Sequence, residues 1–339
     1  MINSNYLTEK EISNNFWAMK GIAIFSVVCA HVGIVTSNDV LLKYLSHILS
    51  NIGTIGVGIF YFISGYFYKF DTNNKSEFIK SKFMKIVLPW IFASTCIWLY
   101  VVLRKGNINF LSWFNFIIGN GSIFYFMTNL IIFFIIFAFL QHIKIKKTYI
   151  YMHILIFLIV LSEIFVIIES EGISLFPTQY LNFMLFIAYF AAGQYLSIKK
   201  LNVIRDKKYK FLLLLSIILV FSPLQLSYWH DFMTLVFEFL FILVTWLFCK
   251  SNNNKLKNFL ILMGKNSFCI FLWHIPIAGI IVNLTNRVEL LQYLIIFRPF
   301  LVCFIVYQFF AWVERYLNKK PILLMTLGIN YKDKDIYIK

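Results

Sequence analysis

Charged residues are scarce in this chain: Asp, Glu, Lys and Arg make up 14% of its 339 residues. The five cysteines all lie inside apolar runs and no Cys-x-x-Cys pair occurs, so neither a disulfide framework nor a metal site is expected. A Gly/Ser-rich linker, an internal repeat and a second soluble domain are also missing. This composition excludes a soluble enzyme, a disordered chain, a collagen and a coiled coil.

What the chain has instead is apolar surface, with 60% hydrophobic residues and a mean hydropathy of +0.77. Because about 20 apolar residues span a bilayer as a helix, we predict an all-α polytopic membrane protein, a bundle of about ten transmembrane helices. The first span is expected to be retained, since it is too long for a cleaved leader. The predicted spans are 21–38, 44–68, 86–103, 122–140, 149–168, 180–198, 211–226, 232–249, 266–284 and 291–311, with an interfacial aromatic segment at 107–121.

The basic residues are distributed unevenly between the two sides of these spans. Of the 31 Lys and Arg, 26 fall in the head, in alternate linkers and in the tail, a pattern that the positive-inside rule describes. Both termini are therefore predicted to be cytosolic. The net charge of +16 is explained by orientation and anionic lipid rather than by nucleic acid. One membrane domain is expected over 1–315, followed by a short cytosolic tail at 316–339.

Several polar side chains fall inside predicted spans, where a charged group is costly and usually faces the bundle interior or an aqueous cavity. Glu163 lies close enough to the outer surface to be hydrated. The candidates are Lys20, His31, Ser64, Asn129, Glu163, Gln194, Glu238, His274 and Arg298.

Lys20 and His31 share one face of the first predicted span. Their spacing of eleven residues is three helical turns and roughly 16 Å, so Lys20 lies near the cytosolic boundary and His31 beyond the midplane. This arrangement suits a substrate with an anionic, cytosol-anchored end and a reactive far end, because imidazole takes up a proton near neutral pH. A lysine that reaches to the interface and a histidine bonded to a neighbouring helix would give the same pattern.

Glu238 and Arg298 lie at similar predicted depths, which permits an ion pair near the level of His31, in a structural or a catalytic role. His274 comes two residues before Pro276, which removes a backbone donor and loosens the preceding turn. Irregular backbone at membrane depth usually lines a cavity. His274 is therefore a candidate for a cavity wall, with a packed core histidine as the alternative.

Four segments of the sequence carry recognisable motifs: FWAMKGIAIFSVVCAH at 16–31, GTIGVGIFYFISGY at 53–66, FIKSKFMKIVLP at 78–89 and SFCIFLWHIP at 267–276. Together they resemble the membrane acyltransferase-3 family, in the family's order and over most of the chain. The first is similar to the family's opening helix, with a basic residue, Gly-Ile-Ala and a later His. The others are similar to its Ser-Gly-aromatic second helix, its cytosolic basic pair before Leu-Pro, and its late His-x-Pro pattern.

The chain departs from the family pattern at three places. Lys82 and Lys85 stand where Arg is usual, and Lys lacks the bidentate fork of a guanidinium. Gly58 stands where many relatives have an acidic residue. The usual Trp-Phe-Leu of the fourth helix is replaced by Phe-Tyr-Phe-Met at 124–127.

The resemblance implies an O-acyltransferase that moves an acyl group, expected to be acetyl, from cytosolic acyl-CoA to a hydroxyl of a cell-envelope or extracellular polysaccharide or its lipid-linked precursor. No permanently bound cofactor is implied. The expected partners are acyl-CoA, a glycan or lipid-linked sugar acceptor, and the bilayer. Heavy use of Asn, Lys, Ile and Phe is typical of AT-rich bacterial genomes, so we expect the bacterial cytoplasmic membrane.

On this resemblance, Lys82 and Lys85, with Lys20, hold the phosphates of CoA as point charges. His31 then acts as general base on the acceptor hydroxyl, or as a nucleophile that forms an acyl-imidazole. Ser64, Asn129 or Arg298 would donate to the oxyanion. The residues expected to be catalytic are His31 and Lys20, and those expected to bind substrate are Lys82, Lys85, Ser64, Asn129, Glu238, His274 and Arg298.

One other function fits part of the pattern, and a second has little support. Ten spans with buried Glu, Arg and His could belong to a transporter of a glycan or an ion, although no inverted repeat is visible. A sensor or scaffold subunit has no positive feature in the sequence. Release of free CoA by the purified protein discriminates transfer from transport.

Overall fold

The computed structural model describes residues 9–70, 74–105, 109–199, 209–221, 233–251, 255–317 and 320–329. Within these ranges the chain is helical and contains no strand. The helices are α1 (Glu9–Val32), α2 (Val40–Phe67), α3 (Lys75–Lys82), α4 (Leu88–Lys105), α5 (Phe110–Ile118), α6 (Tyr125–Lys146), α7 (Thr148–Ser170), α8 (Ile187–Lys199), α9 (Tyr209–Phe221), α10 (Met233–Ser251), α11 (Lys255–Lys265), α12 (Ser267–Asn286), α13 (Glu289–Gln292), α14 (Arg298–Tyr316) and α15 (Pro321–Thr326).

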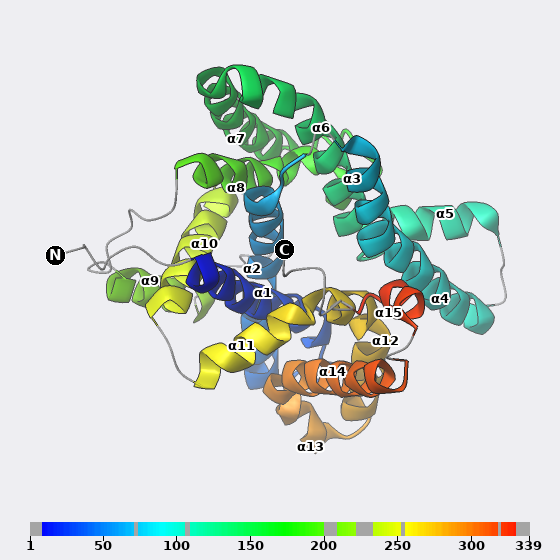
Figure 1. Cartoon of the computed structure of the whole chain (residues 1–339). Helices are drawn as coiled ribbons and strands as arrows, with labels where there is room; N and C mark the ends of the chain where they lie inside the picture. Colours follow the sequence, from blue (N-terminus) through cyan, green and yellow to red (C-terminus); the bar gives the residue numbers. More distant parts are fainter. Residues whose placement is uncertain are drawn as a thin grey trace.

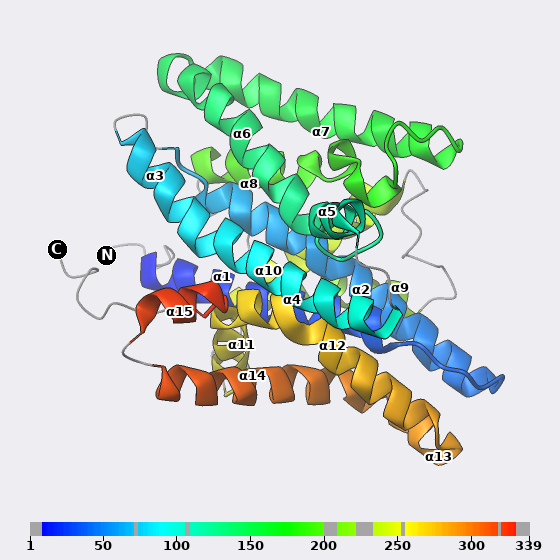
Figure 2. The same cartoon turned by 90° about the vertical axis from the view of Figure 1, so that its right-hand side faces the viewer.

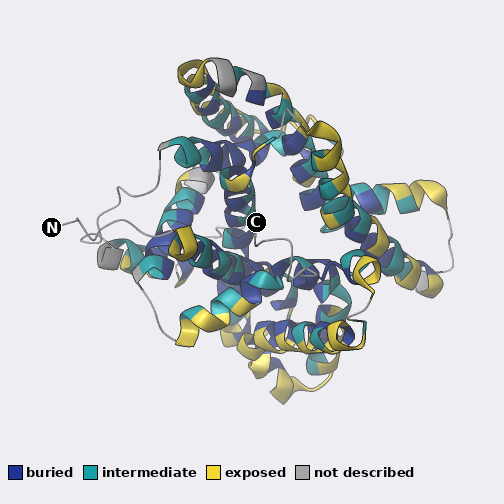
Figure 3. Cartoon of the chain, in the orientation of Figure 1, coloured by how far each residue is buried: buried dark blue, intermediate teal, exposed yellow. Residues whose placement is uncertain are grey.

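The predicted all-helical membrane architecture is confirmed. Among the described residues, six helical stretches are long and apolar enough to cross a membrane: α1, α2, α7, α12, α3 continuing through α4, and α13 continuing through α14. The other four predicted spans overlap the helices α6, α8, α9 and α10. Large apolar side chains are exposed on outer helices such as α7 and α14, as expected for surfaces that face lipid (Figure 3).

Helices α1 and α2 form the centre of the bundle (Figure 1). α1 packs against α2, α10, α11, α12 and α14, and α2 packs against α8 and α10. In the perpendicular view, α7 and α14 lie on opposite sides of this central pair (Figure 2). The residues on the opening helix are therefore placed among neighbours from both halves of the chain.

The crossing of α1 and α11 depends on two glycines. Gly21 faces the backbone carbonyl of Leu260, and Gly264 faces the backbone carbonyl of Trp17, so closely that a Cβ at either glycine would collide with it. Small residues allow helix backbones to approach in this way. The sequence predicts only a basic cytosolic linker at 250–265, whereas the structure has an eleven-residue helix packed on the opening helix.

We expect Gly264→Val to lower the stability of the protein in detergent by about 1–3 kcal/mol, because overpacking a tight contact forces the backbones apart. The change in thermal unfolding temperature measures this effect. Gly279→Ala is the matched control, since nothing lies within 4 Å of the position that its Cβ would take. Equal unfolding temperatures for the two variants would contradict the proposed role of the crossing.

Two predicted spans are interrupted in the structure. Within 180–198 the chain first makes two short 3-10 turns and becomes α-helical at Ile187. The Asn129 side chain donates to the backbone carbonyl of Tyr180 at 2.9 Å, and the Asn182 side chain donates to Glu169 at 3.1 Å. The first bond satisfies a backbone carbonyl that a continuous helix would have paired internally, and the second connects the irregular segment to α7.

The last predicted span, 291–311, is interrupted at Arg298. The preceding residues form α13 and a 3-10 segment, and α14 begins at Arg298 with Pro299 in its first turn, where proline is favoured. The first span also has different bounds: α1 ends at Val32 rather than continuing to residue 38. His31 therefore lies in the last turn of its helix.

Part of the predicted tail packs on the bundle. Leu324 of α15 is fully buried, and the indole Nε1 of Trp273 donates to the carbonyl of Leu327 at 3.1 Å. The two chain ends predicted to be cytosolic, most of the basic linker 199–210 and the predicted span ends at 222–226 and 232 lie outside the described residues.

Candidate active site

Among the described residues, two neighbouring cavities border the opening helix α1. The larger has a volume of about 570 Å³, and His31 is part of its wall. The turn between α5 and α6 closes one side of it: Gly119 ends α5 with a left-handed φ of +91°, at a point where a Cβ would collide with the backbone of Tyr125. This tight reversal brings Ser122 and Tyr125 into the wall of the larger cavity.

The smaller cavity has a volume of about 220 Å³, and Lys20 and Lys85 are part of its wall. Ser64 of α2 and Ser267 of α12 also line it. The structure thus separates the two functional residues of the opening helix, with Lys20 in one cavity and His31 in the other.

Four helices contribute to both cavities and make one path along the bundle. On α1 this wall runs from Lys20 to His31, and on α2 it runs from Ser64 through Phe60 to Thr54. α6 and α12 supply the opposite side of both cavities. The helical spacing of three and four residues explains why one face of α2 serves both cavities.

His31 faces a second histidine. The ring centroids of His31 and His274 are 5.3 Å apart. His274 Nδ1 lies 3.1 Å and 2.8 Å from the backbone carbonyls of Ile270 and Phe271. Because both partners are acceptors, Nδ1 carries the proton and Nε2 is left with a lone pair. That Nε2 is buried and has no hydrogen-bond partner.

The cationic end of the path has two lysines in the cavity wall, Lys20 and Lys85, and a third, Lys82, beside them that does not line the cavity. Lys82 lies near both Lys20 and Lys85, close enough for their charges to repel. Its Nζ lies 4.7 Å from the ring centroid of Phe134, and Lys20 Nζ lies 4.7 Å from that of Trp17. Aromatic faces stabilise these cations without neutralising them, so the cluster keeps its positive charge for an anion.

Arg298, one of the predicted substrate-binding residues, holds the end of α1 instead of lining either cavity. It donates to the carbonyls of Val32 and Ile34 at 3.1 Å and 2.7 Å, and to the side chain of Asn286 at 2.8 Å. A cation at a helix C-terminus is favourable for the helix dipole. The proposed ion pair between Arg298 and Glu238 is wrong, because the two side chains take different neighbours.

Glu238 is buried in α10 and its carboxylate lies against Gly58 of α2 and near Tyr189. A side chain at residue 58 would collide with this carboxylate. The resemblance places an acidic residue at position 58, and here a carboxylate from another helix occupies that neighbourhood. Glu238 does not line either cavity.

Asn129 and Gln194 have structural partners. The Asn129 side chain donates a hydrogen bond to the backbone of Tyr180, a residue that lines the larger cavity. Asn129 does not itself line that cavity. Gln194 donates to the carbonyls of Gly65 and Tyr68 and accepts from the Tyr151 hydroxyl at 2.8 Å. It therefore ties α8 to the end of α2.

Sequence reasoning did not identify the aromatic lining of the path. Phe126 and Phe271 line both cavities, and Tyr125 and Tyr180 line the larger one. Residue type could not single them out, because the chain contains 39 Phe and 19 Tyr. The one local signal for them was spacing: Phe271 lies three residues before His274, on the same helical face.

The described residues thus place a histidine and a lysine cluster along one side of the bundle, at two neighbouring cavities. Residues 14–328 match the acyltransferase domain of the acyltransferase 3 family, and the chain belongs to that family. It is therefore a multi-pass membrane acyltransferase. No curated protein and no solved structure matches the chain.

Proposed function

We propose that this acyltransferase moves an acetyl group from cytosolic acetyl-CoA to a hydroxyl of a cell-envelope or extracellular polysaccharide or its lipid-linked precursor, in a bacterial cytoplasmic membrane. The observation that carries the proposal is the path itself, with Lys20 and Lys85 at one end and His31 at the other. Acetyl-CoA matches this path in shape and charge, because its phosphates lie at one end and its thioester lies at the end of a thin arm.

The lining of the larger cavity supports a sugar acceptor. Its described wall contains the rings of Tyr125 and Tyr180 and the hydroxyl residues Ser50 and Thr54, and no Asp, Glu, Lys or Arg. An apolar and aromatic wall with a few polar groups is typical of small-molecule sites. Such a wall suits a neutral, polyhydroxylated ring better than a charged acceptor.

In the proposed reaction, His31 takes the proton of the acceptor hydroxyl and the oxygen attacks the carbonyl carbon of the thioester. The tetrahedral intermediate then expels the CoA thiolate, which takes the proton back from the imidazolium. The products are the acetyl ester and free CoA. If His31 acts as the nucleophile instead, an acyl-imidazole precedes the ester, and a burst of CoA without acceptor distinguishes this route.

We further propose that His274 positions His31. Its unprotonated Nε2 has no partner, and with the two ring centroids 5.3 Å apart facing ring nitrogens can approach to about 3 Å. A hydrogen bond from His31 to His274 would fix the tautomer of His31. The other nitrogen of His31 would then present its lone pair to the cavity.

The proposed role of the lysine cluster in binding the phosphates of CoA is tested by measuring the KM for the donor. We expect Lys82→Gln and Lys85→Gln each to raise the KM for acetyl-CoA about tenfold with little change in kcat, because each removes one charge-assisted contact to phosphate. Purified protein in detergent, a polysaccharide acceptor and detection of the free CoA thiol provide the measurement.

Two controls accompany this experiment. The KM for acetyl-pantetheine, which lacks the phosphates of CoA, is expected to be the same in wild type and variants. Lys80→Gln removes a charge from an exposed position of the same helix, α3, and is expected to behave as wild type. If the wild-type protein releases no CoA and moves the glycan across sealed vesicles, the function is transport and the proposal fails.

A further inference from the structure

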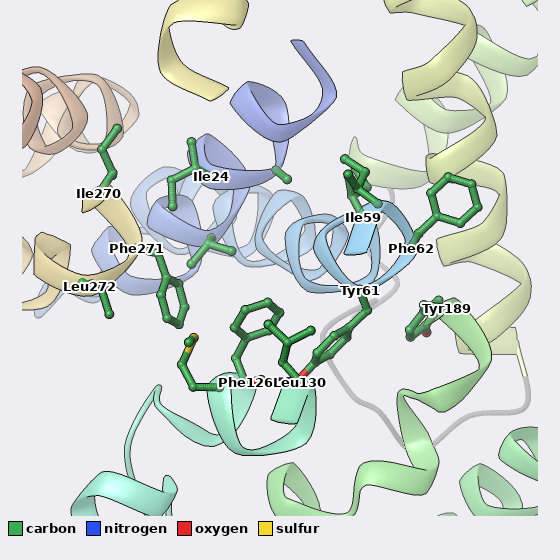
Figure 4. Close-up of a cluster of buried hydrophobic side chains, with 14 of the residues drawn as sticks. Ile24, Ile59, Tyr61, Phe62, Phe126, Leu130, Tyr189, Ile270, Phe271 and Leu272 are labelled. Carbon is green, nitrogen blue, oxygen red and sulfur yellow. Dashed lines mark hydrogen bonds between the residues drawn. The ribbon is translucent and has the colours of Figure 1, made fainter. Parts of the chain in front are cut away.

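Phe126 of α6 and Phe271 of α12 form the wall between the two cavities. They line both of them. Their ring centroids are 5.1 Å apart, and both side chains are buried. In Figure 4 the two rings extend toward one another from the two helices. The path from the lysine cluster to His31 is therefore closed at this pair.

Both phenylalanines are connected to the surrounding site. Tyr61 stacks on Phe126 at 4.6 Å, and its hydroxyl donates to the Phe126 carbonyl at 3.2 Å. The carbonyl of Phe271 accepts from His274, the neighbour of His31. A side-chain rotation at either ring would open the wall without breaking these two hydrogen bonds, because both are accepted by backbone carbonyls.

A permanently open wall would be costly to a cell. Lys20 lies in the middle of α1 and His31 in its last turn, so joining the two cavities would open one continuous path along this half of the helix. Hydrophobic constrictions close such paths by excluding water. Two aromatic rings in contact are a constriction of this kind.

We propose that Phe126 and Phe271 are the binding site for the pantetheine arm of the donor, and that the two rings seal the path when no donor is bound. The arm would pass between the rings, with the phosphates held at Lys20, Lys82 and Lys85 and the thioester placed at His31. The sealing role follows from the geometry alone, whereas the binding role rests on the proposed function.

The seal is tested by proton flux into proteoliposomes that contain a pH-sensitive dye. We expect the double variant Phe126→Ala with Phe271→Ala to leak protons several-fold faster than wild type. Phe124→Ala and Phe268→Ala are matched controls, because Phe124 lines only the larger cavity and Phe268 only the smaller one. Both controls are expected to leak protons no faster than wild type. A second double variant with Leu at both positions removes the rings but keeps most of the volume, and is also expected to leak.

The binding role is tested in the same vesicles with a non-hydrolysable thioether analogue of acetyl-CoA. We expect the double variants to bind the analogue several-fold more weakly than wild type and than the Phe124→Ala and Phe268→Ala controls, because they lack the two rings that would hold the arm; equal affinity would overturn the binding role. Folded double variants that are as tight as wild type, or controls that leak equally, would overturn the seal. CoA release by the wild-type protein is measured in parallel. A leak confined to the double variants, with no wild-type CoA release, would leave the seal standing and remove the acyltransfer chemistry.

Discussion

His31→Ala is expected to reduce CoA release by a factor of about 10²–10⁴, the usual contribution of a general base. His31 borders the larger cavity and the neighbouring His274 Nε2 lacks a partner, so alanine removes the proposed base without removing a buried structural bond. The KM for acetyl-CoA is expected to change little, since the phosphates bind at the lysines. Steady-state CoA release and the ester content of the acceptor measure the loss.

His274→Gln separates the proposed positioning role from a direct role in chemistry. A glutamine amide can replace the hydrogen bond to His31, so we expect a smaller loss than for His31→Ala and a shifted pH profile of kcat. His274→Phe, which provides no acceptor, should lose more activity than His274→Gln. Equal activity of these two variants would contradict positioning, and wild-type ester content in His31→Ala would remove the assignment of the base.

Arg298→Met is expected to destabilise the protein by about 3 kcal/mol or more, because it leaves buried acceptors without their donor. Those acceptors are the carbonyls of Val32 and Ile34 and the side chain of Asn286. We also expect kcat to fall, since the last turn of α1 carries His31 one residue before Val32. Thermal unfolding in detergent and kinetics at a temperature where the variant remains folded give the two effects.

Arg298→Lys and Arg287→Met are informative comparisons. Lysine keeps the charge at the end of α1 but cannot reach three acceptors with a planar fork, so an intermediate loss is expected. Arg287 is exposed at the end of α12, and its removal should change stability little. If Arg298→Met unfolds at the wild-type temperature, the hydrogen bonds of Arg298 do not hold the helix end.

The sequence was most informative where hydrophobicity alone decides the structure. The long apolar windows predicted the membrane helices, because a bilayer core satisfies no backbone hydrogen bonds and only helices or closed barrels avoid that cost. Spacing also predicted that Lys20 and His31 lie along one wall of α1. The interruptions near Tyr180 and Arg298 were not predicted, since each is accompanied by hydrogen bonds to a distant part of the chain, from the Asn129 side chain to Tyr180 and from the Arg298 side chain to Val32.

The candidate site residues also fall into those that the sequence identified correctly and those whose contacts it did not predict. His31, Lys20, Lys85, Ser64 and His274 were identified from residue type and motif, and the structure brings them to the path or beside it. Glu238 and Arg298 were paired on depth alone, and the pairing is wrong because depth along a helix does not give the direction in which a side chain points. Helix rotation is decided by packing.

By itself, the amino-acid sequence determined that this protein is a helical membrane protein, and its motifs indicated the acyltransferase 3 family, because apolar length and short motifs are local properties of a chain. Tertiary structure alone decided that the path is divided in two, and that Phe126 and Phe271 divide it. Such a division depends on which side chains of α6 and α12 meet after packing, and the two residues are separated by more than one hundred positions along the chain.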